Sequence, residues 1–78
     1  MKCIALELPK HFASSTAMTL YIKKLLGIAK VEKRSIHRTG KGKYLKKVLI
    51  AGDVRVEIVY ETDNDGQVTV HSALLCRP

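Results

Sequence analysis

The alternation of hydrophobic and polar residues along the chain begins with a predicted strand. Over residues 2–8, the apolar side chains of Ile4, Leu6 and Leu8 fall on one side of an extended backbone. Pro9 follows, and because proline cannot donate a hydrogen bond to a sheet, it ends the strand. We therefore expect residues 2–8 to form the first strand.

The next segment has the periodicity of an amphipathic helix. Its apolar residues recur at spacings of four, three and four, at Met18, Ile22, Leu25 and Ala29. These spacings place them on one helical face. Three consecutive hydroxyl residues, starting at Ser14, precede this stripe and can cap the amino end of a helix. Residues 14–30 are therefore predicted to hold one helix that packs on a sheet.

The remainder of the chain predicts a meander of three strands. They span residues 44–51, 54–61 and 67–76, and turn-forming residues separate them. Before them, residues 31–42 are polar and basic and end in Gly40-Lys41-Gly42. This composition indicates a short strand or an extended arm followed by a flexible loop.

These elements predict a single α+β domain that comprises all 78 residues. One main helix is expected to pack on one face of an antiparallel sheet, in β-α-β-β-β order. The other face of the sheet is expected to be open and polar.

Positive charge is concentrated in one part of the chain. Fourteen Lys and Arg residues oppose seven acids, which gives a net charge of +7, and ten of the fourteen lie within residues 23–47. Together with glycines and an aromatic ring, such a block suits binding to a phosphate backbone. An anionic membrane surface or an acidic protein would also attract it. The predicted nucleic-acid-binding residues are Lys33, Arg34, Arg38, Lys41, Lys43, Tyr44 and Lys46.

The two cysteines lie at opposite ends of the chain. Cys3 and Cys76 meet only if the first and last strands pair, and two cysteines are few for a disulfide scaffold. We therefore expect both to be reduced and, since no secretory signal is visible, the protein to be cytoplasmic. Neither a metal nor a cofactor is expected, because His11, His37, His71 and the cysteines form no close-spaced ligand pair. No segment is apolar enough to span a membrane.

Counting residue pairs back from the two turns of the meander predicts a row of three side chains that could act in catalysis. With a five-residue loop before the last strand and a three-residue loop before the middle one, Glu57 is expected opposite both His71 and Lys47. RNA transesterification needs a base, an acid and cations, although an exposed sheet face also neutralises its own charges in this way. A one-residue slip would destroy the row. The candidate catalytic residues are Arg55, His71, Arg77, Lys47 and Glu57, with His37 as a second candidate acid.

Residues 42–77 resemble the carboxyl-terminal half of the RelE/ParE superfamily of bacterial toxin–antitoxin toxins. The matching motif consists of Tyr44-Leu45-Lys46-Lys47-Val48, Gly52, Arg55, Val59-Tyr60, Asp63-Asn64-Asp65-Gly66, Val68-Thr69-Val70 and Arg77. The resemblance implies a metal-independent ribonuclease that acts on messenger RNA, often on the ribosome, or a gyrase poison. It also implies an acidic antitoxin as partner and two helices before the meander, whereas residues 14–30 have room for one. Lys46, Lys47, Arg55 and Arg77 would occupy the family's functional basic positions.

Two functions therefore remain open. The first is a small RelE-like endoribonuclease, for which RNA is expected as the target in preference to DNA. The second is a non-catalytic binding module, of the kind phages or mobile elements encode, whose basic patch holds a nucleic acid or an acidic protein. The sequence predicts a nucleic-acid partner in the first case and leaves the partner's class open in the second.

Overall fold

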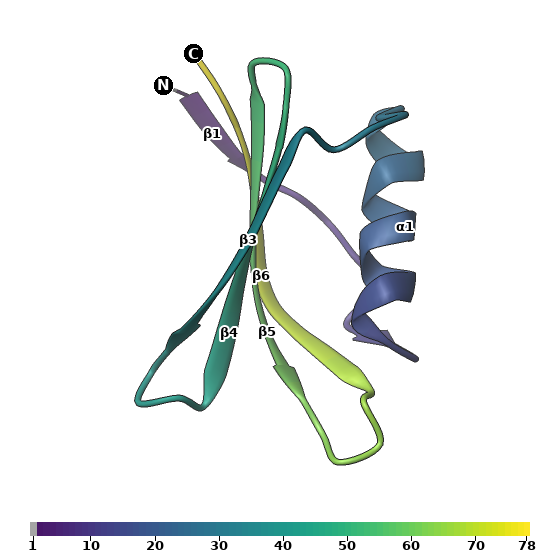
Figure 1. The fold of residues 1–78 in the computed structure, drawn as a ribbon, viewed down its shortest axis with the longest axis vertical. Coiled ribbons are helices and arrows are strands. Elements are labelled where there is room, and N and C mark those ends of the chain that lie inside the picture. Colours follow the sequence, from purple (N-terminus) through teal and green to yellow (C-terminus); the bar gives the residue numbers. More distant parts are fainter. Residues whose placement is uncertain (1) are drawn as a thin grey trace.

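The computed structural model describes residues 2–78 and places one helix against one face of a six-stranded antiparallel sheet (Figure 1). The elements are β1 (Lys2–Ala5), β2 (His11–Phe12), α1 (Ser15–Leu26), β3 (Lys33–Thr39), β4 (Tyr44–Ala51), β5 (Val54–Thr62) and β6 (Val68–Arg77). The strand order is β1-β6-β5-β4-β3, and β2 also pairs with β6. The predicted α+β class, with a helix on an antiparallel sheet, is confirmed.

The predicted first strand is divided into two short ones. β1 ends at Ala5, although the backbone N–H of Leu6 still donates to the carbonyl of Ala73 at 2.9 Å. After Pro9, which lacks an N–H for the ladder, the chain returns to β6 as β2. Two strands therefore precede α1 where the periodicity predicted one.

Caps define both ends of α1. The Ser14 side chain accepts a hydrogen bond from the Ala17 backbone N–H at 3.0 Å, and Gly27 closes the helix in the left-handed conformation, at φ 67°. Met18 and Ile22 are fully buried, as predicted. Leu25 is instead 50% exposed, and the helix ends before the last residue of the predicted stripe. Among residues 2–78 this is the one helix, unlike the pair that the RelE/ParE resemblance implies.

The hydrophobic core lies between α1 and the sheet. Its buried members are Met18, Ile22, Leu49, Val56, Ile58, Tyr60, Val68, Ala73 and Leu75. Burial raises the pKa of the Tyr60 phenol, because the charged phenolate is poorly solvated there. In β5 every second residue, Val56, Ile58 and Tyr60, faces the core. In β6 a bulge lies opposite the Val59/Tyr60 step, so beyond it Ala73 and Leu75 face the core.

Residues 31–42, predicted as a short strand or an extended arm, contain a strand at the edge of the sheet. β3 pairs with β4 from Lys33↔Ile50 to Thr39↔Tyr44. The connection between them has a positive φ at three consecutive residues, 60° at Gly40, 60° at Lys41 and 85° at Gly42. Glycine is suited to such angles because it has no Cβ. The basic segment therefore forms a hairpin with β4.

The first and last strands pair, and this joins the cysteines. Cys3 lies opposite Cys76 in the β1–β6 ladder, and the two form a disulfide with an S–S distance of 2.06 Å. Figure 1 shows the two ends of the chain side by side. The expectation of two reduced cysteines is wrong, because it gave too little weight to this long-range pairing. Within residues 2–78, no helix has the length and apolar character needed to cross a membrane.

Candidate nucleic-acid interface

Among residues 2–78, no element covers the sheet face that turns away from α1 (Figure 1). Side chains of β3, β4 and β5 form three rows across this face, because paired residues point to the same side. The rows are His37–Lys46–Val59, Ser35–Val48–Glu57 and Lys33–Ile50–Arg55. We call this surface the open face.

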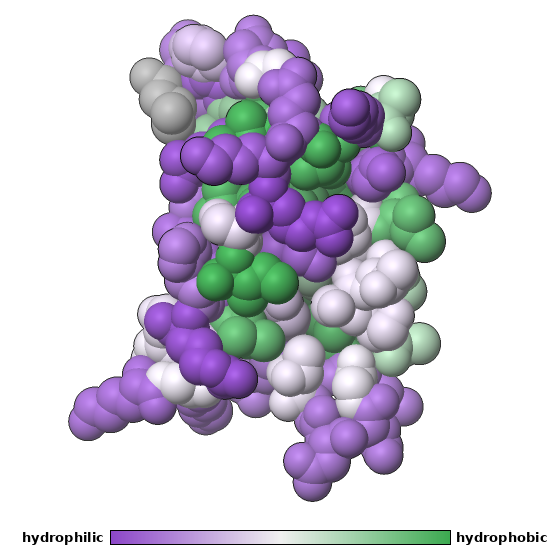
Figure 2. Space-filling model, in the orientation of Figure 1, coloured by the Kyte–Doolittle hydropathy of each residue, from purple (hydrophilic) through white to green (hydrophobic). Residues whose placement is uncertain are grey.

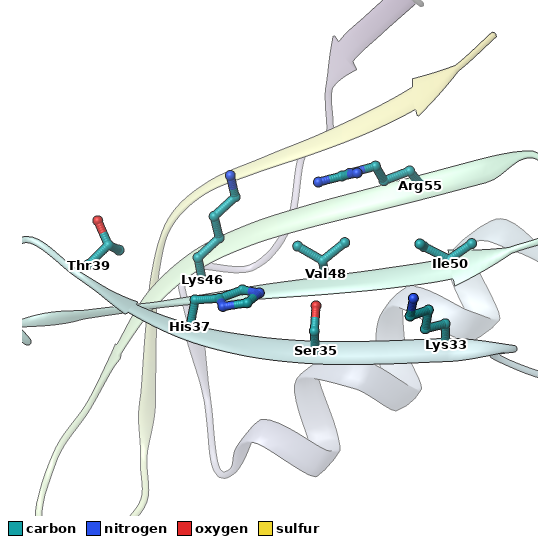
Figure 3. Close-up of a pocket in the computed structure, with 8 residues that line it drawn as sticks. All are labelled: Lys33, Ser35, His37, Thr39, Lys46, Val48, Ile50 and Arg55. Carbon is teal, nitrogen blue, oxygen red and sulfur yellow. The ribbon is translucent and has the colours of Figure 1, made fainter.

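A cleft of about 410 Å³ lies on the open face. Its lining residues are Lys33, Ser35, His37, Thr39, Lys46, Val48, Ile50 and Arg55, whose side chains stand on the side of the sheet away from α1 (Figure 3). Val48, only 6% exposed, and Ile50 provide the apolar part. None of the eight lining residues is acidic, so the cleft combines an apolar floor with positive charge.

Glu57 lies beside the cleft and pairs with two of its cations. One carboxylate oxygen is 2.6 Å from Lys46 Nζ, and the other is 3.7 Å from Arg55 Nε. The hydrogen bond from Lys46 is the main cause that lowers the pKa of Glu57, and the charges of Lys46 and Arg55 add to it. Arg55 Nε is buried and has no hydrogen-bond partner among residues 2–78. The side chain as a whole is 43% exposed, so a ligand can reach the guanidinium but not Nε.

A second cluster lies on the open face at the hairpin end of the sheet. His71 Nε2 is 2.8 Å from a carboxylate oxygen of Glu61. The His71 ring also meets the Tyr44 ring edge to face, with centroids 4.9 Å apart at 84°. Lys43 Nζ lies 5.4 Å from the centroid of the Tyr44 ring. Two flat rings and a cation thus gather where the basic hairpin joins the sheet.

The predicted row of Lys47, Glu57 and His71 does not form. Glu57 lies opposite Leu74 in β6 and opposite Val48 in β4. The turn before β5 holds two residues rather than three, since Ala51 pairs with Val54, and this moves Lys47 to the helix side. Glu61 pairs with Thr69 of β6 and not with Gln67, which is a shift of two residues, and the bulge adds a third. Lys46 instead of Lys47 contacts Glu57.

The remaining predicted site residues are spread over several parts of the molecule. Lys33 and Lys46 line the open-face cleft, and Lys41 and Lys43 lie in the hairpin connection. Arg38 Nη1 donates to the Gly42 carbonyl at 3.3 Å and thereby braces the same hairpin. Arg34 and Lys47 line a cleft beside α1, and Arg77 lies opposite Lys2 at the end of β6.

Several cleft residues were missed from the sequence. Ser35, Thr39 and Ile50 were not among the predicted site residues, Val48 appeared only in the RelE/ParE motif, and His37 was predicted only as a candidate acid. For the residues of β3 the signal is the period of two over residues 33–39, which puts Ser35, His37 and Thr39 on one side of a strand. Recognising it required assigning that segment as a strand in the first place.

The described part of the chain, residues 2–78, contains no group of three His, Cys, Asp or Glu side chains placed to hold a metal ion. Fold and surface together define a small α+β domain with one basic, uncovered sheet face. No protein-family model matches the chain, and comparison with curated proteins and with solved structures finds no match. The resemblance to RelE/ParE toxins therefore remains a prediction that rests on the motif in residues 42–77.

Proposed function

We propose that this protein binds single-stranded nucleic acid, RNA in preference to DNA, on the open face. The observation that carries this proposal is the cleft of about 410 Å³, where basic side chains surround the apolar residues Val48 and Ile50. Phosphates would contact Lys33, Lys46 and Arg55, and a base or sugar would cover the apolar floor. This combination of cations and a flat apolar surface is what single-stranded nucleic acid requires.

The aromatic cluster favours an unpaired strand over a duplex. Tyr44 and His71 present rings beside the cleft, and an unpaired base can stack on such rings, whereas the bases of a duplex already stack on one another. The hydroxyls of Ser35 and Thr39 line the cleft and can hydrogen-bond to a ribose 2′-hydroxyl, which DNA lacks. These contacts support RNA as the preferred ligand.

The test is fluorescence anisotropy with a labelled single-stranded RNA that carries a 5′-hydroxyl, measured across a salt series. The slope of log K against log salt is expected to decrease in magnitude by about 0.7 for each phosphate contact that is removed. Arg55→Gln and Lys46→Met should each show this decrease. Lys47→Met is the matched control, because it removes the same charge one residue away on the other side of the sheet. Equal losses for the Lys46 and Lys47 variants would show that net charge alone drives binding.

A second candidate function is metal-independent cleavage of the bound RNA, and the contact between His71 and Glu61 favours it. When Nε2–H of His71 donates to Glu61, Nδ1 holds a lone pair that can accept the proton of a 2′-hydroxyl. The 2′-oxygen would then attack phosphorus and form the 2′,3′-cyclic phosphate, while the bond from phosphorus to the 5′-oxygen breaks and that oxygen takes a proton from water. Lys46 lies opposite Val59, next to the bulge that holds His71, and would be the cation that stabilises the phosphorane.

Incubation of RNA with the protein in excess EDTA, with and without ribosomes, separates the two candidates. Cleavage to a 2′,3′-cyclic phosphate that His71→Asn abolishes would support a metal-independent endoribonuclease. Retained cleavage by Arg77→Gln would show that Arg77, a position that the RelE/ParE resemblance implies, takes no part. Salt-sensitive binding without cleavage would leave a non-catalytic binding module. In that case an acidic protein that competes with RNA for the open face would fit the same charges.

The cytoplasmic location predicted from the sequence also remains a proposal. The Cys3–Cys76 disulfide counts against it, because the glutathione and thioredoxin systems keep most cytosolic thiols reduced. Titration of free thiols in protein isolated under acid quench would show which state is present in the cell. Two alkylated cysteines would favour the cytoplasm, whereas two protected ones would favour an oxidising compartment.

A further inference from the structure

A second cleft, of about 250 Å³, lies on the helix side of the sheet. Its lining residues are Ser15, Thr16, Thr19, Leu20, Lys23, Arg34, Ile36 and Lys47. They come from one side of α1 and from β3 and β4. Figure 2 shows that hydrophilic and hydrophobic residues both reach the surface in the view of Figure 1, where β3 lies in front of the other strands. We call this the helix-side cleft.

Lys47 is a buried cation without a counter-charge. The residue is 3% exposed, and its Nζ donates to Thr19 Oγ1 at 2.7 Å. The Thr19 hydroxyl in turn donates to the Ser15 carbonyl at 3.0 Å. Because this hydroxyl is neutral, it supplies no counter-charge for Lys47. Within residues 2–78, no carboxylate forms an ion pair with Lys47. Burial lowers the pKa of Lys47, and the charge of Arg34 lowers it further.

Two more cations line the same cleft. Arg34 lies on β3 on the same side of the sheet as Lys47, and Lys23 lies on α1. Neither forms an ion pair among residues 2–78. Glu57 and Glu61 are engaged on the open face instead. Three positive charges thus repel one another around a cavity, and burial of an unpaired charge is unfavourable unless something compensates it.

We propose that the helix-side cleft binds a phosphomonoester. A dianionic phosphate would compensate the three cations, Arg34 can bind it through two parallel N–H donors, and the hydroxyls of Ser15 and Thr16 supply further donors. Leu20 and Ile36, 55% and 53% exposed, form an apolar wall for the organic part of the ligand. The phosphate can belong to a small phosphorylated molecule or to the 5′ end of a nucleic-acid strand. This site is separate from the open face.

The first test measures thermal unfolding in inorganic phosphate and in sodium chloride of equal ionic strength. Phosphate should raise the midpoint of the wild type, because a ligand that binds only the folded state stabilises it. Lys47→Met should weaken phosphate binding at least about tenfold, since it removes a charged hydrogen-bond donor. Lys24→Met, with the same change in charge at an exposed residue of α1 that does not line the cleft, should respond like the wild type. An equal response of wild type and Lys47→Met, or no response specific to phosphate, would overturn the proposal.

Arg34→Gln provides a second variant, because Arg34 is exposed and its replacement should leave the fold intact. It too should reduce the phosphate response, and a full response would count against the site even if Lys47→Met fails to fold. Oligonucleotides with a 5′-phosphate or a 5′-hydroxyl identify the source of the phosphate. Tighter binding of the 5′-phosphorylated strand that Lys47→Met abolishes would assign the strand end. Equal binding of both strands, with a retained response to inorganic phosphate, would assign a small phosphorylated molecule.

Discussion

Reduction of the disulfide between Cys3 and Cys76 is expected to remove a large share of this protein's stability. The two cysteines are 73 positions apart, so the bond closes almost the whole chain into a ring. A cross-link of this kind restricts mainly the unfolded chain, whose entropy it lowers. β1 is also short and exposed along its length, so without the bond only main-chain pairing to β6 holds it.

The chain-entropy relation gives the expected magnitude. For a ring of this size it predicts about 4.5 kcal/mol at 25 °C. A chain of 78 residues usually has a free energy of unfolding of roughly 4–12 kcal/mol, at about 0.05–0.15 kcal/mol per residue. The disulfide therefore contributes between about a third of the stability and all of it.

Urea unfolding followed by circular dichroism, with and without a phosphine reductant, measures this contribution. Reduction should lower the midpoint by about 2–4 M urea and steepen the transition, because the freed chain exposes more surface. Cys3→Ser is the control variant. It should resemble the reduced wild type and should not respond to reductant.

Two results would refute this reasoning. Equal midpoints for the oxidised and reduced wild type would show that the ring does not constrain the unfolded chain. Two free thiols in native protein prepared without reductant would show that the bond does not form, although the β1–β6 ladder brings the cysteines together.

Four further predictions concern single residues. Lys47→Met should raise the free energy of unfolding at pH 7 by about 1 kcal/mol, since it removes a buried, unpaired ammonium. The pKa of Lys47 is lowered in the folded protein, so the wild type gains stability as pH rises from that pKa toward 10.5. The free energies of unfolding of the variant and the wild type, measured in urea, should therefore differ less at pH 9.5 than at pH 7. The pKa of Glu57 is also lowered, so the wild type should lose stability as pH falls from 4.5 through the folded pKa, and Glu57→Gln should lack this loss in thermal scans from pH 6 to pH 2. Gly40→Ala should cost about 1–2 kcal/mol, because the new Cβ would lie 2.5 Å from the Tyr44 ring at a φ of 60°; an unchanged Tyr44 ring-proton spectrum would contradict this. Ser14→Ala should cost about 1 kcal/mol in urea unfolding through loss of the helix cap, and no measurable cost would mean that the cap contributes nothing.

The helix and the meander could be predicted because their signals are local. Met18 and Ile22 repeat with the period of a helix, and Val56, Ile58 and Tyr60 repeat with the period of a strand. Each pattern shows which side of one segment is apolar, and that side is buried in the core whichever segments lie next to it. The excess of positive charge before residue 48 is likewise visible in the sequence and has its counterpart in the two basic clefts.

The candidate site could be predicted only in part, because its residues meet through pairing between distant segments. The sequence predicted functional roles for Lys46 and Lys47. The sheet face that each lysine occupies, however, depends on a turn of two residues rather than three. Because side chains alternate along a strand, this difference of one residue places Lys46 beside Glu57. It places Lys47 on the other side of the sheet, where it is a buried cation next to α1. The bulge that brings His71 to Tyr44 has no local signal either.

By itself, then, the sequence determined the helix, the three strands of the meander that follow it, and the chain's positive charge, because residues close in the chain decide these properties. Tertiary structure alone decided the register of the strands, the division of the lysines between the two faces, and the disulfide between Cys3 and Cys76. These depend on which segments pair and at which residue the pairing starts. The free energy that selects one pairing is spread over the whole sheet and its core and belongs to no single segment.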